Sequence, residues 1–266
     1  DIKKIETPLN LFSDRKNSLG VDLSEEDNIK LYSTLKSFED VKAYSIVEGE
    51  NASSHIESNI VSPYSTSKII GRAFFADSKI VGQALTSLNS YTSIWKNEDI
   101  IKRIEIIDNF SDLLESNYLQ LVTACVKEAG KTISDSLADI REAIDFCRYY
   151  SVLAKDLFHE VKLPGPTGET NLYKLKGKGL SVVISPWNFP IAIFTGQLVA
   201  ALITGNVVLA KPSEQTSYCA YIVFKLLLKA GLPNKAAALL LGKGQDIGSQ
   251  IFSNQQLKNV VFTGSL

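Results

Sequence analysis

The longest apolar run of the chain starts at Leu180 and ends at Ala210, without one charged residue in between. A proline-containing turn divides the run early, and a Gly-Asn pair divides it late. This punctuation predicts a strand at 180–184, a helix at 190–204 and a second strand at 207–210. Because both strands are apolar on both faces, they are typical of a buried βαβ unit in a parallel sheet.

A membrane span is the alternative interpretation of this run, since a span needs about 20 consecutive apolar residues. The turn-forming residues argue against it. Pro186, Asn188 and Pro190 interrupt the first half of the run. Pro190 suits the first turn of a helix, where its missing N–H costs nothing, and Gly205 suits the position just past the end. We therefore predict no membrane span.

The chain outside this run changes its periodicity several times. Residues 1–40 show little pattern and predict an arm. Residues 41–75 contain short alternating runs that predict edge strands, and residues 76–157 have helical spacing. Residues 158–179 are rich in Gly, Pro and Lys and predict a protruding β-hairpin.

Several local signals refine this outline. One helical face carries apolar residues at regular spacing: Ile101, Ile104, Ile107 and Phe110. Gly130 suits the end of one helix, and Thr216 or Ser217 can cap a later one. Two further strands are predicted at 236–241 and 259–262, so the alternation of strands and helices continues to the end of the sequence.

Polar residues follow the first two strands of the buried unit directly. The first strand is followed by Ser-Pro-Trp-Asn-Phe-Pro (185–190), and the second by Lys-Pro-Ser-Glu (211–214). Ligands of open parallel sheets bind beyond the carboxyl ends of the strands. Because both clusters fall at that edge, we predict a ligand site there.

Pro-Trp-Asn-Phe-Pro followed by Lys-Pro-Ser-Glu at this spacing resembles the cofactor-binding half of the NAD(P)-dependent aldehyde dehydrogenases. The resemblance implies that Asn188 donates a side-chain N–H to the oxyanion of the reacting carbonyl. It implies that Lys211 and Glu214 hold the adenosine ribose of the cofactor. A carboxylate accepts from two ribose hydroxyls but repels a 2′-phosphate, so Glu214 favours NAD over NADP.

Other interpretations of the same residues remain open on the sequence. Asn188 can be a helix cap, and Glu214 can be a solvated acid in a first helical turn. Gly-x-Gly-x-x-x-Gly (242–248) is one residue longer than the dinucleotide fingerprint, and Phe-Thr-Gly-Ser (262–265) matches the family's turn towards the pyrophosphate. The full set of expected cofactor-binding residues is Ile184, Ser185, Pro186, Trp187, Lys211, Ser213, Glu214, Gly244, Gly248, Gly264 and Ser265.

A narrower resemblance concerns residues 15–23 and 128–150. Both segments are similar to the glutamate-semialdehyde dehydrogenase (pyrroline-5-carboxylate dehydrogenase) module of the bifunctional proline utilization A proteins. This resemblance implies oxidation of L-glutamate γ-semialdehyde to L-glutamate in proline catabolism. It also implies a homo-oligomer in which residues 158–179 reach a partner subunit. A solvated loop is the alternative for that segment.

These expectations give one fold class and divide the chain into four parts. The class is α/β, a doubly wound parallel sheet with preceding helices, edge strands and a hairpin. The parts are an N-terminal arm (1–40), edge strands and helices of the cofactor-binding domain (41–157), an oligomerisation hairpin (158–179) and a Rossmann-like NAD-binding core (180–266).

The composition of the chain argues against two classes of partner. The chain has 28 basic and 29 acidic residues, so it shows no electrostatic footprint for nucleic acid or an anionic membrane. The first residues are polar and lack the apolar segment of a signal peptide, which makes a cytoplasmic location the default. The absence of Met and the point at which the sequence stops suggest a segment trimmed from a longer polypeptide.

Cys125, Cys147 and Cys219 lie on apolar helical faces, where thiols are buried and inert. None of them is a candidate nucleophile, and the family's general-base Glu is also not found. We therefore expect half an active site and no dehydrogenase activity from the 266 residues alone. Two alternatives are a non-catalytic module that binds nucleotide or a partner subunit, and a relative that reduces an acyl phosphate or acyl-CoA.

Overall fold

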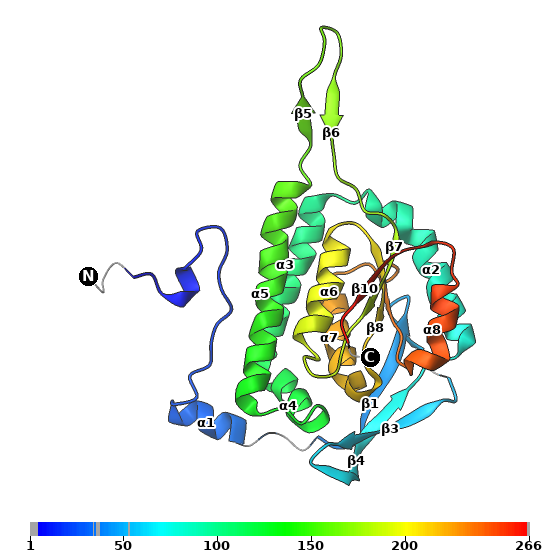
Figure 1. Cartoon of the computed structure of the whole chain (residues 1–266). Helices are drawn as coiled ribbons and strands as arrows, with labels where there is room; N and C mark the ends of the chain where they lie inside the picture. Colours follow the sequence, from blue (N-terminus) through cyan, green and yellow to red (C-terminus); the bar gives the residue numbers. More distant parts are fainter. Residues whose placement is uncertain (1–4, 34, 36–37, 53, 265–266) are drawn as a thin grey trace.

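The computed structural model describes residues 5–33, 35, 38–52 and 54–264. Its centre is an eight-stranded sheet in the order β10-β7-β8-β9-β1-β4-β3, with β2 paired to β1 (Figure 1). The strands of this sheet are β1 (Val41–Val47), β2 (Glu50–Ala52), β3 (Glu57–Ser62), β4 (Ser65–Phe74), β7 (Leu180–Ile184), β8 (Val207–Lys211), β9 (Ala237–Leu239) and β10 (Leu257–Phe262). Two shorter strands, β5 (Val161–Leu163) and β6 (Asn171–Tyr173), form a separate hairpin.

Helices lie on both faces of the sheet (Figure 1). They are α1 (Glu26–Ser33), α2 (Ser78–Lys96), α3 (Ile100–Ser116), α4 (Tyr118–Glu128), α5 (Ile133–Leu157), α6 (Ala192–Ile203), α7 (Ser217–Lys229) and α8 (Gly244–Phe252), with short 3-10 turns η2 (Pro8–Asn10) and η3 (Glu214–Thr216). On one face, α6 and α7 pack against the strands and are covered in turn by α3, α4 and α5. On the other face, α2 packs against the sheet and against α8.

The parallel half of the sheet confirms the predicted α/β class. Strands β10, β7, β8 and β9 run parallel to one another. Every residue of β8 and all but the last of β7 are buried, as expected for strands that are apolar on both faces. Because these strands run parallel, their carboxyl ends lie at the same edge of the sheet.

The other half of the sheet confirms the prediction of edge strands for residues 41–75 in part. β3 forms the edge and β2 pairs with β1 off the main strand order, whereas β1 lies inside the sheet, antiparallel to β9 and parallel to β4. The close approach of β1 and β4 depends on Gly71, because a Cβ at this position would lie 2.2 Å from the Val41 carbonyl oxygen. The short runs were indicative of strands, but strand order depends on pairing across the whole chain.

Helix α6 largely follows its prediction. It begins at Ala192, two residues after Pro190, so the proline lies in the preceding turn and not in the helix itself. Gly205 follows the helix end with φ +82°, a conformation that glycine adopts without strain. None of the helices in the described part of the chain combines the length and the apolar composition that crossing a bilayer demands.

Two details of the helical layer differ from the predictions. Ile101 of α3 is exposed, whereas Ile107 and Phe110 of the predicted face are buried, together with Leu114. At the start of α7, neither Thr216 nor Ser217 provides a side-chain cap. The N–H groups of Tyr218 and Cys219 donate instead to the carboxylate of Glu128 in α4, at 2.8 and 2.7 Å.

The N-terminal arm is attached to the helical layer at Ser18, which is buried. Its N–H and Oγ donate to the two carboxylate oxygens of Asp145 in α5, at 2.7 and 3.0 Å. Arg148 donates to the Asn17 carbonyl at 3.0 Å. This part of the predicted arm is therefore packed against α5.

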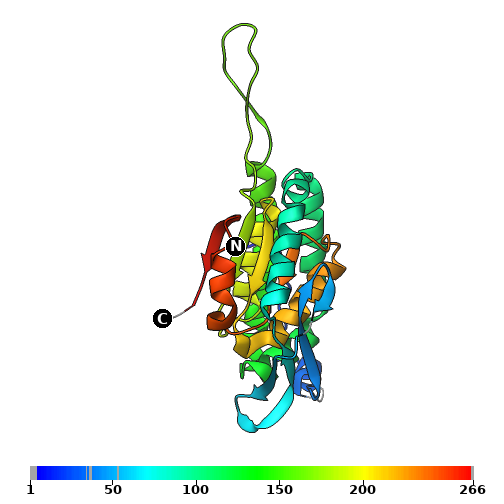
Figure 2. The ribbon, with the colours of Figure 1, turned by 90° about the vertical axis from the view of Figure 1, so that its right-hand side faces the viewer.

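The β5–β6 hairpin extends away from the body in two perpendicular views (Figures 1 and 2). Its antiparallel pairing confirms the predicted strand–turn–strand pattern. Leu163, Leu172 and Tyr173 are all exposed on it, so the hairpin carries apolar side chains that the body does not cover.

Candidate functional site

A cavity of about 890 Å³ opens at the carboxyl ends of β7 and β8. The two strands are paired, and the Ser185 N–H donates to the Lys211 carbonyl at 3.3 Å just where they end. Two turns therefore diverge from adjacent points, one towards α6 and one towards α7. The cavity lies between them and is closed on the other side by α8 and β10.

The structure brings the residues expected from the sequence together around this cavity. Those that line it are Ile184, Ser185, Pro186, Trp187, Asn188, Lys211, Ser213, Glu214, Gly244, Gly248 and Gly264. Ser265, the remaining member of the set, lies outside the described residues. Apolar residues not singled out from the sequence also contribute, among them Ile193 and Ile251. The binding roles of all these residues stay predictions, whereas their convergence is a fact of the fold.

The turn between β7 and α6 projects three consecutive side chains. Trp187, Asn188 and Phe189 are all exposed, and Asn188 lies on the cavity wall. The helix-cap alternative for Asn188 receives no support, because the N-cap position of α6 is Ile191. The first helical N–H, that of Ala192, donates to Asp139 at 2.8 Å.

Lys211 and Glu214 face the same cavity from the end of β8. Lys211 is buried, and its Nζ donates to the Pro212 carbonyl at 3.0 Å and lies 3.9 Å from Glu214 Oε2. Burial lowers the pKa of the Lys211 ammonium group, and the charge of Glu214 opposes this effect. The carboxylate of Glu214 is partly exposed, so it remains accessible to a hydroxyl-bearing ligand.

The glycines of the cavity leave space beside the charged pair. A Cβ at Gly244 would lie 3.9 Å from Lys211 Cε, so the backbone at the start of α8 approaches the lysine side chain closely. The N-terminus of a helix favours anionic groups, because its first N–H groups have no partner within the helix. The cavity thus combines a cation, a carboxylate and a glycine-lined helix start.

Sequence reasoning missed two charged residues beside the site. Lys131 Nζ donates to the Asn188 carbonyl at 3.0 Å and lies 3.4 Å from Asp139 Oδ2. Burial raises the pKa of Asp139, although Lys131 and the N–H of Ala192 favour its ionised form. The sequence signal for Lys131 was its position directly after Gly130, a residue that suits a helix end. In the structure Gly130 has φ +69°, and the chain changes direction there after α4.

The three cysteines are buried, as predicted, and none lines the cavity. Burial raises the pKa of the Cys147 and Cys219 thiols well above the ordinary range. A thiol in such surroundings stays protonated and is a poor nucleophile.

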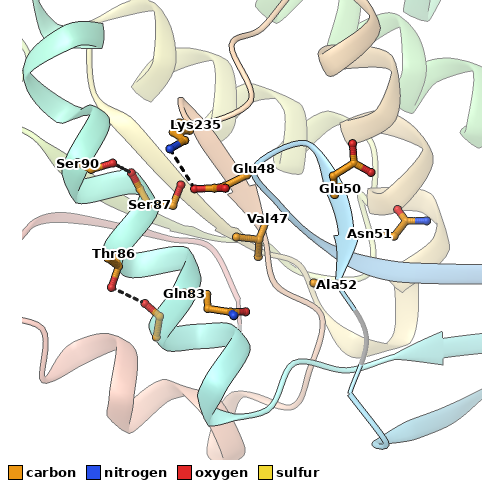
Figure 3. Close-up of a pocket in the computed structure, with 11 residues that line it drawn as sticks. Val47, Glu48, Glu50, Asn51, Ala52, Gln83, Thr86, Ser87, Ser90 and Lys235 are labelled. Atoms are coloured by element: carbon orange, nitrogen blue, oxygen red, sulfur yellow. Dashed lines mark hydrogen bonds and ion pairs between the residues drawn. The ribbon is translucent and has the colours of Figure 1, made fainter.

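A second cavity of about 660 Å³ lies between the β1–β2 hairpin and α2 (Figure 3). Several of its polar groups are engaged with neighbouring protein atoms. Glu48 pairs with Lys235 at 3.3 Å, and the hydroxyls of Thr86 and Ser90 donate to backbone carbonyls of their own helix. None of the residues singled out from the sequence lines this cavity, so the site at the ends of β7 and β8 is the stronger candidate.

Comparison with known proteins agrees with the fold and the motifs. Residues 50–266 match the model of the aldehyde dehydrogenase family. The chain is 37% identical to the bifunctional protein PutA of Escherichia coli strain K12, over 98% of this chain and 19% of that protein. It is 31% identical to a 1-pyrroline-5-carboxylate dehydrogenase of Staphylococcus aureus strain MW2, over 94% of this chain and 49% of that enzyme.

Solved structures give the same result. The crystal structure of proline utilization A from Bdellovibrio bacteriovorus superimposes with a TM-score of 0.90 at 29% identity, covering 98% of this chain and 27% of that chain. A Thermus 1-pyrroline-5-carboxylate dehydrogenase with bound NAD superimposes with a TM-score of 0.87 at 26% identity, covering 92% of this chain and 48% of that chain. The chain thus spans about half the length of these single-function relatives and a fifth to a quarter of the bifunctional ones. On the match of residues 50–266, the chain belongs to the aldehyde dehydrogenase family.

Proposed function

We propose that this chain is the NAD-binding portion of a dehydrogenase that oxidises L-glutamate γ-semialdehyde to L-glutamate in proline catabolism. The observation that carries the proposal is the convergence of Asn188, Lys211 and Glu214 on one cavity at the carboxyl edge of a parallel sheet. The substrate class is supported by the names of the relatives, which are PutA proteins and 1-pyrroline-5-carboxylate dehydrogenases.

The donors around the cavity fit a dinucleotide. The Glu214 carboxylate accepts hydrogen bonds from ribose hydroxyls, and the Lys211 ammonium, buried beside it, donates to the same sugar. Gly244 and the start of α8 leave room for the ligand beside the lysine. A 2′-phosphate would place negative charge against Glu214, so NAD is preferred to NADP. When bound, NAD accepts the hydride of the oxidation.

Asn188 supplies the catalytic contribution of this chain in the proposal. Its amide N–H donates to the carbonyl oxygen of the aldehyde as that oxygen becomes negative, which stabilises the transition state. The nucleophilic thiolate is not one of the three cysteines described above, since all are buried. The 266 residues alone are expected to bind NAD weakly at best and to turn over no aldehyde.

Nucleotide binding can be tested on the chain itself. Trp187 is exposed on the cavity wall and Trp95 is buried, so a change in tryptophan fluorescence on addition of a ligand reports mainly on the site. We expect NAD to change this fluorescence at lower concentrations than NADP. Glu214→Ala is expected to weaken NAD binding and to reduce the preference over NADP. Glu39→Ala, which removes an exposed acid away from the cavity, is the control. Equal response to both nucleotides in the wild type would contradict the assignment of Glu214.

The reaction must be tested with the protein as its gene encodes it. We expect NADH formation from glutamate γ-semialdehyde, followed by absorbance. If that protein binds NAD but oxidises no aldehyde, a non-catalytic nucleotide-binding role replaces the proposal. If it instead reduces an acyl phosphate or acyl-CoA, the reductase alternative is correct.

A further inference from the structure

The turn that carries Asn188 is held by charged residues from another part of the chain. Lys131 lies between α4 and α5, and its Nζ donates to the Asn188 carbonyl at 3.0 Å across 57 residues of sequence. The same ammonium group lies 4.3 Å from the centre of the Phe189 ring. Two successive residues of the turn therefore contact one cation, one through its backbone and one through its side chain.

Asp139 fixes Lys131 and the following helix together. It is 1% exposed, its Oδ2 lies 3.4 Å from Lys131 Nζ, and its Oδ1 accepts the N–H of Ala192 at 2.8 Å. A buried carboxylate at the N-terminus of a helix is favoured by the free N–H groups and by the helix dipole. The apex and the far end of the turn are thus tied to one ion pair, with Lys131 at Asn188 and Asp139 at the first residue of α6.

We propose that Lys131 and Asp139 are positioning residues that set the orientation of Asn188 towards the reacting carbonyl. The Asn188 carbonyl and the Asn188 side chain share one Cα, so a cation that fixes the peptide also restricts where the amide can point. The turn itself is exposed and contains few other polar anchors within the described residues, which leaves Lys131 as the contact that reaches its apex. The catalytic part of this inference rests on the proposed function, whereas the restraint on the turn does not.

The restraint can be measured without any activity assay. Trp187 precedes Asn188 and is 53% exposed, whereas Trp95 is 1% exposed and shielded from a soluble quencher. In Lys131→Met and Asp139→Asn, we expect faster acrylamide quenching of Trp187 and a red shift of its emission, because the turn becomes mobile. Lys131→Arg keeps a cation and is expected to restore the wild-type values. Lys127→Met is the matched control, since Lys127 is near the same helix end but lies 5.9 Å from the Tyr64 ring and not at the turn.

The catalytic consequence is measured in the protein as its gene encodes it. We expect Lys131→Met to lower kcat about 10- to 100-fold while the KM for NAD stays nearly unchanged, because misplacement of a catalytic group by about 1 Å has effects of this size. A purely structural role would lower thermal stability and leave kcat per folded molecule unchanged, and this result would overturn the positioning role. Unchanged Trp187 quenching in both variants would overturn the restraint. Altered quenching in a chain that binds no NAD would preserve the restraint and refute the proposed function instead.

Discussion

Glu128 is a fully buried carboxyl group whose ionisation affects the stability of the protein. It accepts the N–H groups of Tyr218 and Cys219, which favour the carboxylate, but burial prevails and raises its pKa to about 7. Between the ordinary pKa of 4.5 and about 7, the folded state keeps a proton that the unfolded state releases. The free energy of unfolding therefore falls as pH rises through this window, by about 3 kcal/mol in total, and is flat above it.

Glu128→Gln is expected to remove this pH dependence, because the amide carries no titrating proton. Urea denaturation at pH 5 and pH 8 measures the effect as a difference between the two pH values. The wild type is expected to lose stability relative to the Gln variant over that range. Glu142→Gln, at an exposed position of α5, should follow the wild type. Parallel pH profiles for wild type and Glu128→Gln would contradict the assignment.

Asn188→Ala tests the proposed oxyanion donor in the protein as its gene encodes it. Loss of one such donor lowers kcat by about 10²–10³-fold, or roughly 2.7–4 kcal/mol, and NAD affinity should change little. Collapse of NAD binding with an unchanged rate per complex would make Asn188 a cofactor-loop residue. A fall in stability of about 1 kcal/mol without a kinetic effect would make Asn188 a structural residue of the turn with no part in the reaction. Rate, NAD affinity and thermal melting of this one variant decide among the three.

Single residues were predictable from the sequence where a short motif follows a strand directly. Asn188, Lys211 and Glu214 were found in this way, because adjacent parallel strands bring their ends together. Lys131 and Glu128 were missed, because their partners lie 57 and 90 residues away and no local pattern records such a contact. Charged groups that act across elements become visible only when the helices are packed.

At the scale of elements, apolar runs bounded by turns predicted β7, β8 and β10 within a few residues. The order of strands was not predictable by the same means. β1 and β4 have the short alternating pattern of edge strands, yet both lie inside the sheet. The position of a strand is decided by which neighbour offers free N–H and C=O groups, and this depends on long-range pairing rather than on its own residues.

The β5–β6 hairpin supports a prediction about association. A two-stranded hairpin is marginally stable in water, and this one exposes Leu163, Leu172 and Tyr173. We expect a second copy of the chain to cover these side chains. Leu172→Asp should weaken association about 10- to 150-fold, since burial of such a side chain contributes about 1.5–3 kcal/mol.

Sedimentation velocity at several protein concentrations measures this effect. Ile69→Asp is the control, because Ile69 is as exposed as Leu172 (55% and 54%) but lies on β4 in the body. An equal loss of association in both variants, or in neither, would exclude the hairpin as the contact surface.

At the scale of the whole molecule, the attachment of the arm to α5 can be separated from the stability of the body. Asp145 holds the N–H and hydroxyl of Ser18. Asp145→Ala should reduce the free energy with which the arm docks on α5 by about 2 kcal/mol, which raises the detached fraction by a factor of about 30. Trypsin cleavage after Arg15 and Lys16 should accelerate accordingly, while melting of the body changes little. Asp156→Ala, an exposed position of the same helix, should leave the cleavage rate unchanged.

The place of β1 within the sheet has a consequence for synthesis on the ribosome. Ile46 pairs with Leu239, and the Leu241 N–H donates to Ser45 Oγ across 196 residues. At about 5–20 residues per second, translation of that interval takes roughly 10–40 s. During this time β1, β3 and β4 have been made but the β9 side of β1 has no partner strand. The nascent chain therefore carries an open strand edge until residues 237–239 are translated, and chaperones that shield such edges have that interval in which to act.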